Sequence, residues 1–161
     1  MKNYVISFIP AKGISSKVKK KNLLKINNKT LLEIAIITSK KCKNINETFV
    51  STESNKIKNI AKKYDCKIIS RPNYLSTNKA KGIEVIKHFC KNLDKSYKKK
   101  NPIIVVLQPT SPLRTIRDIK KSLQLFKKSK SKVLVSVVKN KYNSFKDMII
   151  KKNKLISITN P

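Results

Sequence analysis

The sequence predicts an α/β fold with a mostly parallel β-sheet, and two observations indicate it. Short apolar, β-branched runs alternate with segments of roughly ten residues whose apolar side chains recur at helical spacing. This alternation is typical of β-α-β units. The run Ile103–Leu107 (IIVVL) is apolar throughout, as expected for a central strand covered on both faces. The length, 161 residues, is that of one domain, so we expect a single domain over residues 1–161.

The predicted elements follow one another in a regular order. The first strand is Tyr4–Ile9, and the first helix is Leu31–Ser39, where Thr30 is an N-cap candidate that forms a capping box with Glu33. The remaining elements are predicted from the same periodicities. We expect strands at Thr48–Ser51, Cys66–Ser70, Ile103–Leu107 and Val133–Val138, and helices at Ser54–Tyr64, Ala80–Leu93 and Ile116–Phe126.

Positive charge dominates the composition, with 39 Lys and Arg residues against 8 Asp and Glu and a formal net charge of +31. One interpretation is nucleic-acid binding through phosphate contacts. However, the lysines are spread along the whole chain, and arginine, which often reads base edges, occurs only at Arg71, Arg114 and Arg117. Lys, Ile and Asn share A/T-rich codons, so we favour genome composition as the explanation and expect no specific nucleic-acid partner.

Several other classes of protein are excluded. The apolar runs are far shorter than the roughly 20 residues of a membrane span, and the first run is too short for a secretory signal, so no membrane partner is expected. The three cysteines form no CxxC pair, and with one histidine a zinc site is not expected. We therefore expect a cytoplasmic protein with reduced thiols.

The loop after the first predicted strand, residues 11–22, combines Gly13, the hydroxyls of Ser15 and Ser16, and several lysines. Ligands of open parallel sheets bind beyond the carboxyl ends of the strands, which is where this loop lies. Glycine allows a phosphate to approach the backbone, and lysines neutralise a polyphosphate. The order of residues is not that of a Walker A loop. A solvated lysine-rich loop is the alternative interpretation. We call residues 11–22 the first loop.

The loop after Leu107, residues 108–115, is rigidified by two prolines and contains Gln108, which can donate and accept hydrogen bonds. Arg114 offers bidentate recognition of a carboxylate or phosphate, which lysine cannot provide. The same reasoning marks Arg71, directly before Pro72. For both arginines a structural salt bridge is the alternative. We call residues 108–115 the second loop.

Four stretches resemble the acylneuraminate cytidylyltransferases, the CMP-sialic acid synthetase family. They are Ile9–Gly13 continuing to Leu23, Val50–Glu53, Arg71–Leu75 and Leu107–Arg114 (LQPTSPLR). The resemblance runs in order from about residue 4 to residue 138, and LQPTSPLR is its most specific part. Lys21-Asn22 favours the acylneuraminate branch over the deoxyoctulosonate branch.

The resemblance implies a Rossmann-like nucleotidyltransferase three-layer α/β fold. It implies transfer of CMP from CTP to the anomeric hydroxyl of a nine-carbon α-keto sugar acid, with release of pyrophosphate. Such a reaction calls for fixed cations and Mg²⁺ rather than covalent catalysis. The family's dimerisation segment falls about where this sequence stops, so a homodimer is one expectation and the oligomeric state is open.

The resemblance also assigns residues to roles. Lys12 and Lys21 would be the catalytic cations, Asn22 would hold the ribose and Arg71 would read cytosine. The expected nucleotide contacts are Ala11, Lys12, Gly13, Ser15, Lys21, Asn22, Arg71 and the backbone near Ala80. The expected sugar contacts are Gln108, Thr110, Ser111 and Arg114.

The sequence departs from the family pattern at several positions. Lys12 replaces an arginine, Glu53 replaces an aspartate, and Asn78 stands at another usual aspartate. The carboxyl-terminal part of the family, with its paired Mg²⁺-binding aspartates, has no counterpart, so no metal ligand is assigned and a truncated chain is expected. A non-catalytic nucleotide-binding remnant is therefore the alternative hypothesis, and a basic nucleic-acid-binding protein is a third.

Overall fold

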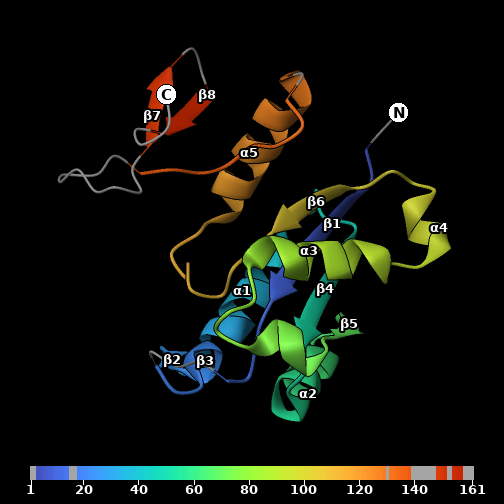
Figure 1. Cartoon of the computed structure of the whole chain (residues 1–161), viewed down its shortest axis with the longest axis vertical. Coiled ribbons are helices and arrows are strands. Elements are labelled where there is room, and N and C mark those ends of the chain that lie inside the picture. The colour runs from blue at the N-terminus through green and yellow to red at the C-terminus, as the bar shows by residue number, and fades with distance from the viewer. Residues whose placement is uncertain (1–2, 15–17, 130, 139–147, 152–153, 158–161) are drawn as a thin grey trace. The chain divides into compact units, whose positions relative to one another are not determined.

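A four-stranded parallel sheet forms the centre of the computed structural model, which describes residues 3–14, 18–129, 131–138, 148–151 and 154–157. The strand order is β5-β4-β1-β6, and each neighbouring pair is parallel (Figure 1). The strands are β1 (Val5–Pro10), β4 (Glu47–Thr52), β5 (Lys67–Ser70) and β6 (Ile103–Val106). This sheet lies in the first of two compact units, Met1–Leu125.

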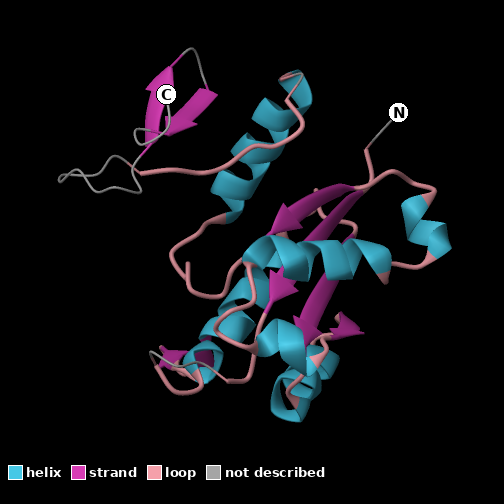
Figure 2. Cartoon of the chain, viewed as in Figure 1, coloured by secondary structure: helices cyan, strands magenta, loops and turns pink. Residues whose placement is uncertain are grey.

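Helices connect the strands and cover both faces of the sheet, as the alternating pattern predicts (Figure 2). The longer helices are α1 (Leu31–Lys41), α2 (Asn55–Lys63), α3 (Gly82–Lys91) and α5 (Ile116–Lys128). The shorter elements are η1 (Lys21–Leu23), β2 (Lys25–Ile26), β3 (Lys29–Thr30), η2 (Asn73–Ser76) and α4 (Lys95–Lys98).

Strand β1 shows why the fold has three layers. Its alternate side chains enter two separate apolar clusters, because successive side chains of a strand point to opposite faces. Val5 and Ile9 pack with residues of α1, α2 and α5. Ile6 and Phe8 pack with residues of α3, and the stacked rings of Phe8 and Phe89 have their centroids 4.3 Å apart. The predicted three-layer α/β fold is thus confirmed.

The start of α1 confirms the predicted capping box. The Thr30 hydroxyl accepts from the Glu33 backbone N–H at 3.1 Å, and the Glu33 carboxylate accepts from the Thr30 backbone N–H at 2.8 Å. The hydrogen bond from the Thr30 backbone lowers the pKa of Glu33. Two orphan N–H groups at the helix start are satisfied in this way.

Two expectations about strands are wrong. Strand β6 pairs with β1 alone among the described residues, so Ile103–Val106 of the IIVVL run forms a half-buried edge strand rather than a central one. Its apolar pattern arises because Ile103 and Val105 face one cluster while Ile104 and Val106 face the other. Val133–Val138 is not a strand: Val133 is 72% and Val138 is 89% exposed. Its β-branched residues favour extended backbone, but a strand also requires a paired neighbour.

The second compact unit is Phe126–Pro161. It contains the antiparallel strands β7 (Met148–Lys151) and β8 (Lys154–Ser157). A single domain over residues 1–161 stays a prediction. Across the described parts of the chain, no helix has both the length and the apolar character needed to cross a membrane.

Candidate functional site

The first loop leaves β1 at the carboxyl edge of the sheet, where the sequence predicts a site. The buried Ala11 donates its backbone N–H to the carbonyl oxygen of Ser51 at 3.0 Å, which continues the pairing of β1 with β4 by one residue. The carboxyl ends of β4 and β5 lie at the same edge, because all four strands are parallel. The loop therefore begins against the residues that follow its neighbouring strand.

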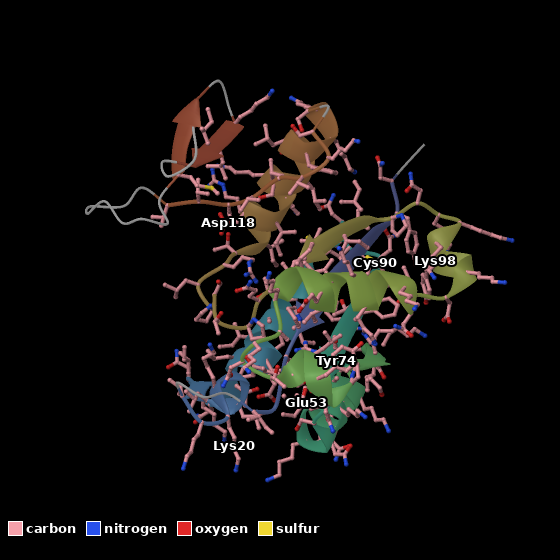
Figure 3. The ribbon with its side chains drawn as sticks, viewed as in Figure 1. Lys20, Glu53, Tyr74, Cys90, Lys98 and Asp118 are labelled. Carbon is pink, nitrogen blue, oxygen red and sulfur yellow. The ribbon has the colours of Figure 1, made fainter. Side chains whose placement is uncertain are left out.

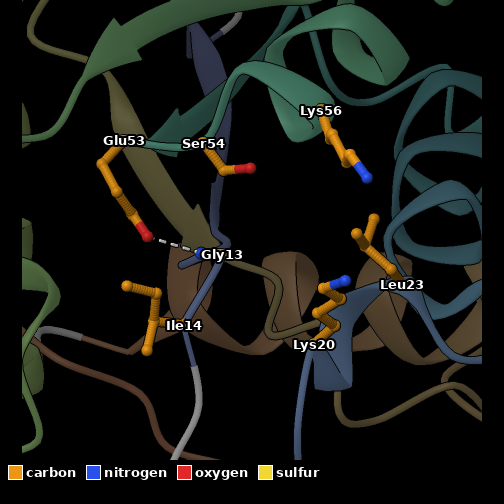
Figure 4. A pocket seen from close by; sticks show the side chains of 7 residues that line it. All are labelled: Gly13, Ile14, Lys20, Leu23, Glu53, Ser54 and Lys56. Carbon is orange, nitrogen blue, oxygen red and sulfur yellow. Dashed lines mark hydrogen bonds between the residues drawn. The ribbon is translucent and has the colours of Figure 1, made fainter.

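Gly13 is in direct contact with the end of β4. Its backbone N–H donates to Glu53 Oε1 at 2.6 Å (Figure 4). A Cβ atom at this position would lie 2.6 Å from Ser54 Cβ, closer than real Cβ atoms approach one another. The sequence suggested that this glycine admits a phosphate; the structure shows a different requirement, the close packing of the first loop on Glu53 and Ser54.

Lys12 connects the first loop to the segment that follows η2. Its ammonium donates to Asn78 Oδ1 at 3.0 Å and to the Thr77 carbonyl oxygen at 3.4 Å. Its own carbonyl oxygen accepts from the Nδ2 of the buried Asn22 at 2.8 Å. Asn22 thus holds the backbone of the loop, and its predicted contact with ribose stays a prediction.

Arg71 is an arginine with only 6% of its surface exposed, at the carboxyl end of β5. Its Nε donates to Ser51 Oγ at 3.2 Å and its Nη2 to the Ser51 carbonyl oxygen at 2.8 Å. Burial lowers the pKa of Arg71, and the nearby charge of Glu53 opposes this. The guanidinium therefore ties β5 to β4, and its predicted reading of cytosine is not tested by these contacts.

Glu53 is the carboxylate around which these segments meet. Besides Gly13, it accepts from Ser76 Oγ at 2.8 Å. Burial alone would raise the pKa of Glu53, but hydrogen bonds from its own backbone, Ser76 and Gly13, with the charge of Arg71, outweigh burial and lower it. We call this set the strand-end network: Ala11, Lys12, Gly13, Asn22, Ser51, Glu53, Arg71, Ser76 and Asn78.

A pocket of about 250 Å³ opens beside the network. It is lined by Gly13, Ile14, Lys20, Leu23, Glu53, Ser54 and Lys56 (Figure 4). Lys20 and Lys56 bring two cations to its wall. Lys21 is half-buried in η1, next to Lys20, and Ser15 lies outside the described residues. Ala80, another predicted nucleotide contact, is half-buried against the apolar cluster of α3.

The second loop brings its predicted sugar contacts together by local hydrogen bonds. Ser111 N–H donates to the Gln108 carbonyl oxygen at 3.2 Å, and Arg114 Nη2 donates to the same oxygen at 3.3 Å. Gln108, Thr110 and Ser111 are exposed, whereas Arg114 is half-buried. Burial lowers the pKa of Arg114, and Asp118 on α5 opposes this. Figure 3 labels Glu53, which the first loop contacts, and Asp118, on the helix that follows the second loop.

Sequence reasoning assigned no role to Ser51, Glu53 or Ser76. The resemblance marked Glu53 only as a replaced aspartate, although it is one of only 8 acidic residues and lies two positions beyond a predicted strand. Ser51 and Ser76 carried no comparable signal. The expected Mg²⁺ lacks a ligand group in the part of the chain that the structure describes, where no three His, Cys, Asp or Glu side chains gather to hold a metal ion.

Solved structures with a similar fold include cytidylyltransferases. A CMP-2-keto-3-deoxy-manno-octonic acid synthetase in complex with CTP gives a TM-score of 0.63 at 21% identity, covering 78% of this chain and 48% of that one. A cytidylyltransferase from Leptospira borgpetersenii gives 0.56 at 22% identity, covering 81% of this chain and 50% of that one. At this identity the likeness concerns the fold alone, and it confirms the predicted Rossmann-like nucleotidyltransferase fold.

The chain belongs to the cytidylyltransferase family, whose profile matches residues 6–159. It is 30% identical over 141 residues to N-acylneuraminate cytidylyltransferase of Escherichia coli O18:K1:H7, covering 87% of this chain and 32% of that protein. It is 28% identical over 146 residues to the post-translational flagellin modification protein B of Campylobacter coli, covering 90% of this chain and 62% of that protein. The chain thus spans less than two-thirds of either relative.

Proposed function

We propose that this chain binds CTP and transfers CMP to a nine-carbon α-keto sugar acid with release of pyrophosphate. The observation that carries the proposal is the strand-end network. In a member of the cytidylyltransferase family, it brings five of the predicted nucleotide contacts together at the carboxyl edge of the sheet. These five are Ala11, Lys12, Gly13, Asn22 and Arg71. The name of the Escherichia coli relative supports the choice of sugar acid.

The triphosphate requires cations whose charge is not already neutralised. Lys12 meets this requirement, because its partners are an amide oxygen and a backbone carbonyl rather than a carboxylate. Lys21 is half-buried in η1, and Lys20 and Lys56 line the adjacent pocket. Preorganised cations at this position would stabilise the charge that spreads over the phosphoryl group during transfer.

The sugar acid would bind at the second loop. The half-buried Arg114 can form two parallel hydrogen bonds to a carboxylate, which is the group common to α-keto sugar acids. Gln108, Thr110 and Ser111 offer an amide and two hydroxyls to the sugar hydroxyls. In the reaction, the sugar hydroxyl oxygen forms a bond to the α-phosphorus while the bond to pyrophosphate breaks. Bound Mg²⁺ would further neutralise the phosphates, but the described residues supply no ligand group for it.

The test is pyrophosphate release by the purified chain with CTP, Mg²⁺ and a panel of nine-carbon α-keto acids, with ATP as the control nucleotide. Release that requires both CTP and one sugar acid is the expected result. Arg114→Lys should abolish the sugar-dependent release of pyrophosphate, whereas Arg117→Lys, at an exposed position on α5, should leave it unchanged. CTP binding without release would instead favour a non-catalytic nucleotide-binding protein, and equal release with ATP would contradict the proposal.

A further inference from the structure

The carboxylate of Glu53 joins two segments that are far apart in the sequence. Its Oε1 accepts from Gly13, 40 residues earlier, and its Oε2 accepts from Ser76, 23 residues later. Each oxygen therefore holds a different side of the candidate site. An amide at this position could accept through one oxygen only, so the arrangement depends on a carboxylate.

The consequence of the Gly13 contact extends to Lys12. Gly13 is held by Glu53, and the carbonyl oxygen of Lys12 is held by Asn22, so the Lys12 backbone is restrained on both sides. The Lys12 ammonium then reaches Asn78, only two residues beyond Ser76, which Glu53 also holds. Glu53 thus restrains both the residue that carries this cation and the segment toward which the cation points.

We propose that Glu53 is a positioning residue, which acts through Gly13 and Ser76 to hold Lys12 in the geometry that binds the triphosphate. The inference rests on the proposed function, because it assigns Glu53 a part in CTP binding. Glu53 does not itself contact the nucleotide in this proposal. Its negative charge next to a triphosphate would be unfavourable unless neighbouring cations compensate for it.

Three cations lie beside Glu53 or line the same pocket. Arg71 lies at the end of β5, Lys20 next to η1 and Lys56 on α2, and Glu53 is the only carboxylate among the described residues that line the pocket. The hydrogen bonds and the Arg71 charge lower the pKa of Glu53, so it is ionised at neutral pH. A carboxylate so held can restrain the loop without leaving the site negatively charged.

The test compares Glu53→Gln with Glu47→Gln, which removes the same charge at the opposite end of the same strand. Losing one charged hydrogen bond predicts about tenfold weaker CTP binding in Glu53→Gln. Binding of cytidine, which has no phosphates, should change by less than about twofold, and Glu47→Gln should bind CTP as the wild type does. Equal losses for CTP and cytidine in Glu53→Gln, or no loss of CTP binding, would overturn the inference.

A second measurement in the free protein separates this inference from the proposed function. In ¹⁵N spectra the Gly13 amide should shift as pH falls below 4.5 in the wild type and stay constant in Glu53→Gln.

Ser76→Ala is a milder change that keeps the Gly13 contact with Glu53. It should weaken CTP binding about threefold even if Glu53→Gln fails to fold. If the Gly13 amide signal does not shift with pH in the wild type, the hydrogen bond from Gly13 to Glu53 is contradicted. A wild type in which Gly13 titrates but CTP does not bind overturns the proposed function and leaves Glu53 a structural residue only.

Discussion

The two loops of the candidate site are stabilised in different ways. The first loop is held by contacts with distant residues: Gly13 bonds Glu53, 40 residues away, and Lys12 bonds Asn78, 66 residues away. The second loop is held by contacts within itself, since Arg114 bonds Gln108 only 6 residues away. The first loop therefore depends on the assembled sheet, whereas the second is a local turn before α5.

This difference has consequences for stability and for binding. Substitutions in the strand-end network should lower the free energy of unfolding and the affinity for CTP together, because the same contacts support both. Substitutions in the second loop should affect binding of the sugar acid while stability stays nearly constant. Four substitutions should separate the effects on stability from those on ligand binding, from the largest expected change to the smallest.

Arg71→Ala should destabilise the fold most. It removes a buried guanidinium that donates to Ser51 Oγ and to the Ser51 carbonyl oxygen. The Ser51 hydroxyl then lacks this donor, while the carbonyl oxygen keeps only the Ala11 N–H. We expect the free energy of unfolding to fall by about 3 kcal/mol, measured by urea denaturation. The control is Arg117→Ala at an exposed position, which should change it by less than about 0.5 kcal/mol. A similar small change in both variants would contradict the role of Arg71 in the network.

Gly13→Ala should follow, because its Cβ would meet Ser54 Cβ at 2.6 Å. Overpacking of this kind predicts a loss of about 2 kcal/mol, together with weaker CTP binding as Gly13 moves away from Glu53. Gly82→Ala is the matched control, since an added Cβ there meets no atom within 4 Å. That variant should be more stable by about 0.5 kcal/mol, because alanine lowers the conformational entropy of the unfolded chain. Thermal unfolding of both variants gives the comparison.

Acid should weaken the first loop through Glu53. The pKa of Glu53 is lowered in the folded protein, so its contribution to stability is complete above pH 4.5 and is lost as pH falls through the folded-state pKa. At pH 7, Glu53→Gln should be less stable than the wild type by about 1 kcal/mol, allowing for partial solvent screening of the charge. The two proteins should converge in urea denaturation once the pH falls below the folded-state pKa of Glu53. A difference that persists there would show that the charge is not its source.

Arg114→Lys should have the smallest effect on stability. Its side chain makes one bond to the carbonyl of Gln108, within a loop whose other predicted sugar contacts are exposed. We expect the free energy of unfolding to change by less than about 0.5 kcal/mol, while binding of the sugar acid, followed by calorimetry, is lost. A loss of stability like that of Arg71→Ala would remove the contrast between the loops.

Much of the fold could be predicted because it follows from local patterns. The capping box at Thr30 and the alternation of strands and helices are local, and the structure confirms both. The edge position of Ile103–Leu107 was not predictable in this way, since an apolar run shows that both faces are covered but not how many neighbours the strand has. The same limit applies to Val133–Val138, whose β-branched composition says nothing about a partner strand.

The candidate site was predictable in position but not in its internal contacts. Loops that follow parallel strands meet at one edge, so the meeting of Lys12, Gly13 and Arg71 follows from the predicted topology. The partners of these residues, Ser51 and Glu53, depend on side-chain directions that arise only when the strands assemble. The resemblance predicted that Gly13 contacts the nucleotide. Its close packing on Ser54 is visible only in the folded structure.

We infer that the first loop and the end of β5 form a CTP site independently of the second loop. The most direct test of this inference is a ¹⁵N titration of the chain with CTP, then with a nine-carbon α-keto acid. CTP alone should shift the amides of Lys12, Gly13, Asn22 and Arg71, and the amides of residues 108–114 should shift only when the sugar acid is added. Shifts in residues 108–114 with CTP alone, or equal shifts with ATP in place of CTP, would contradict the claim.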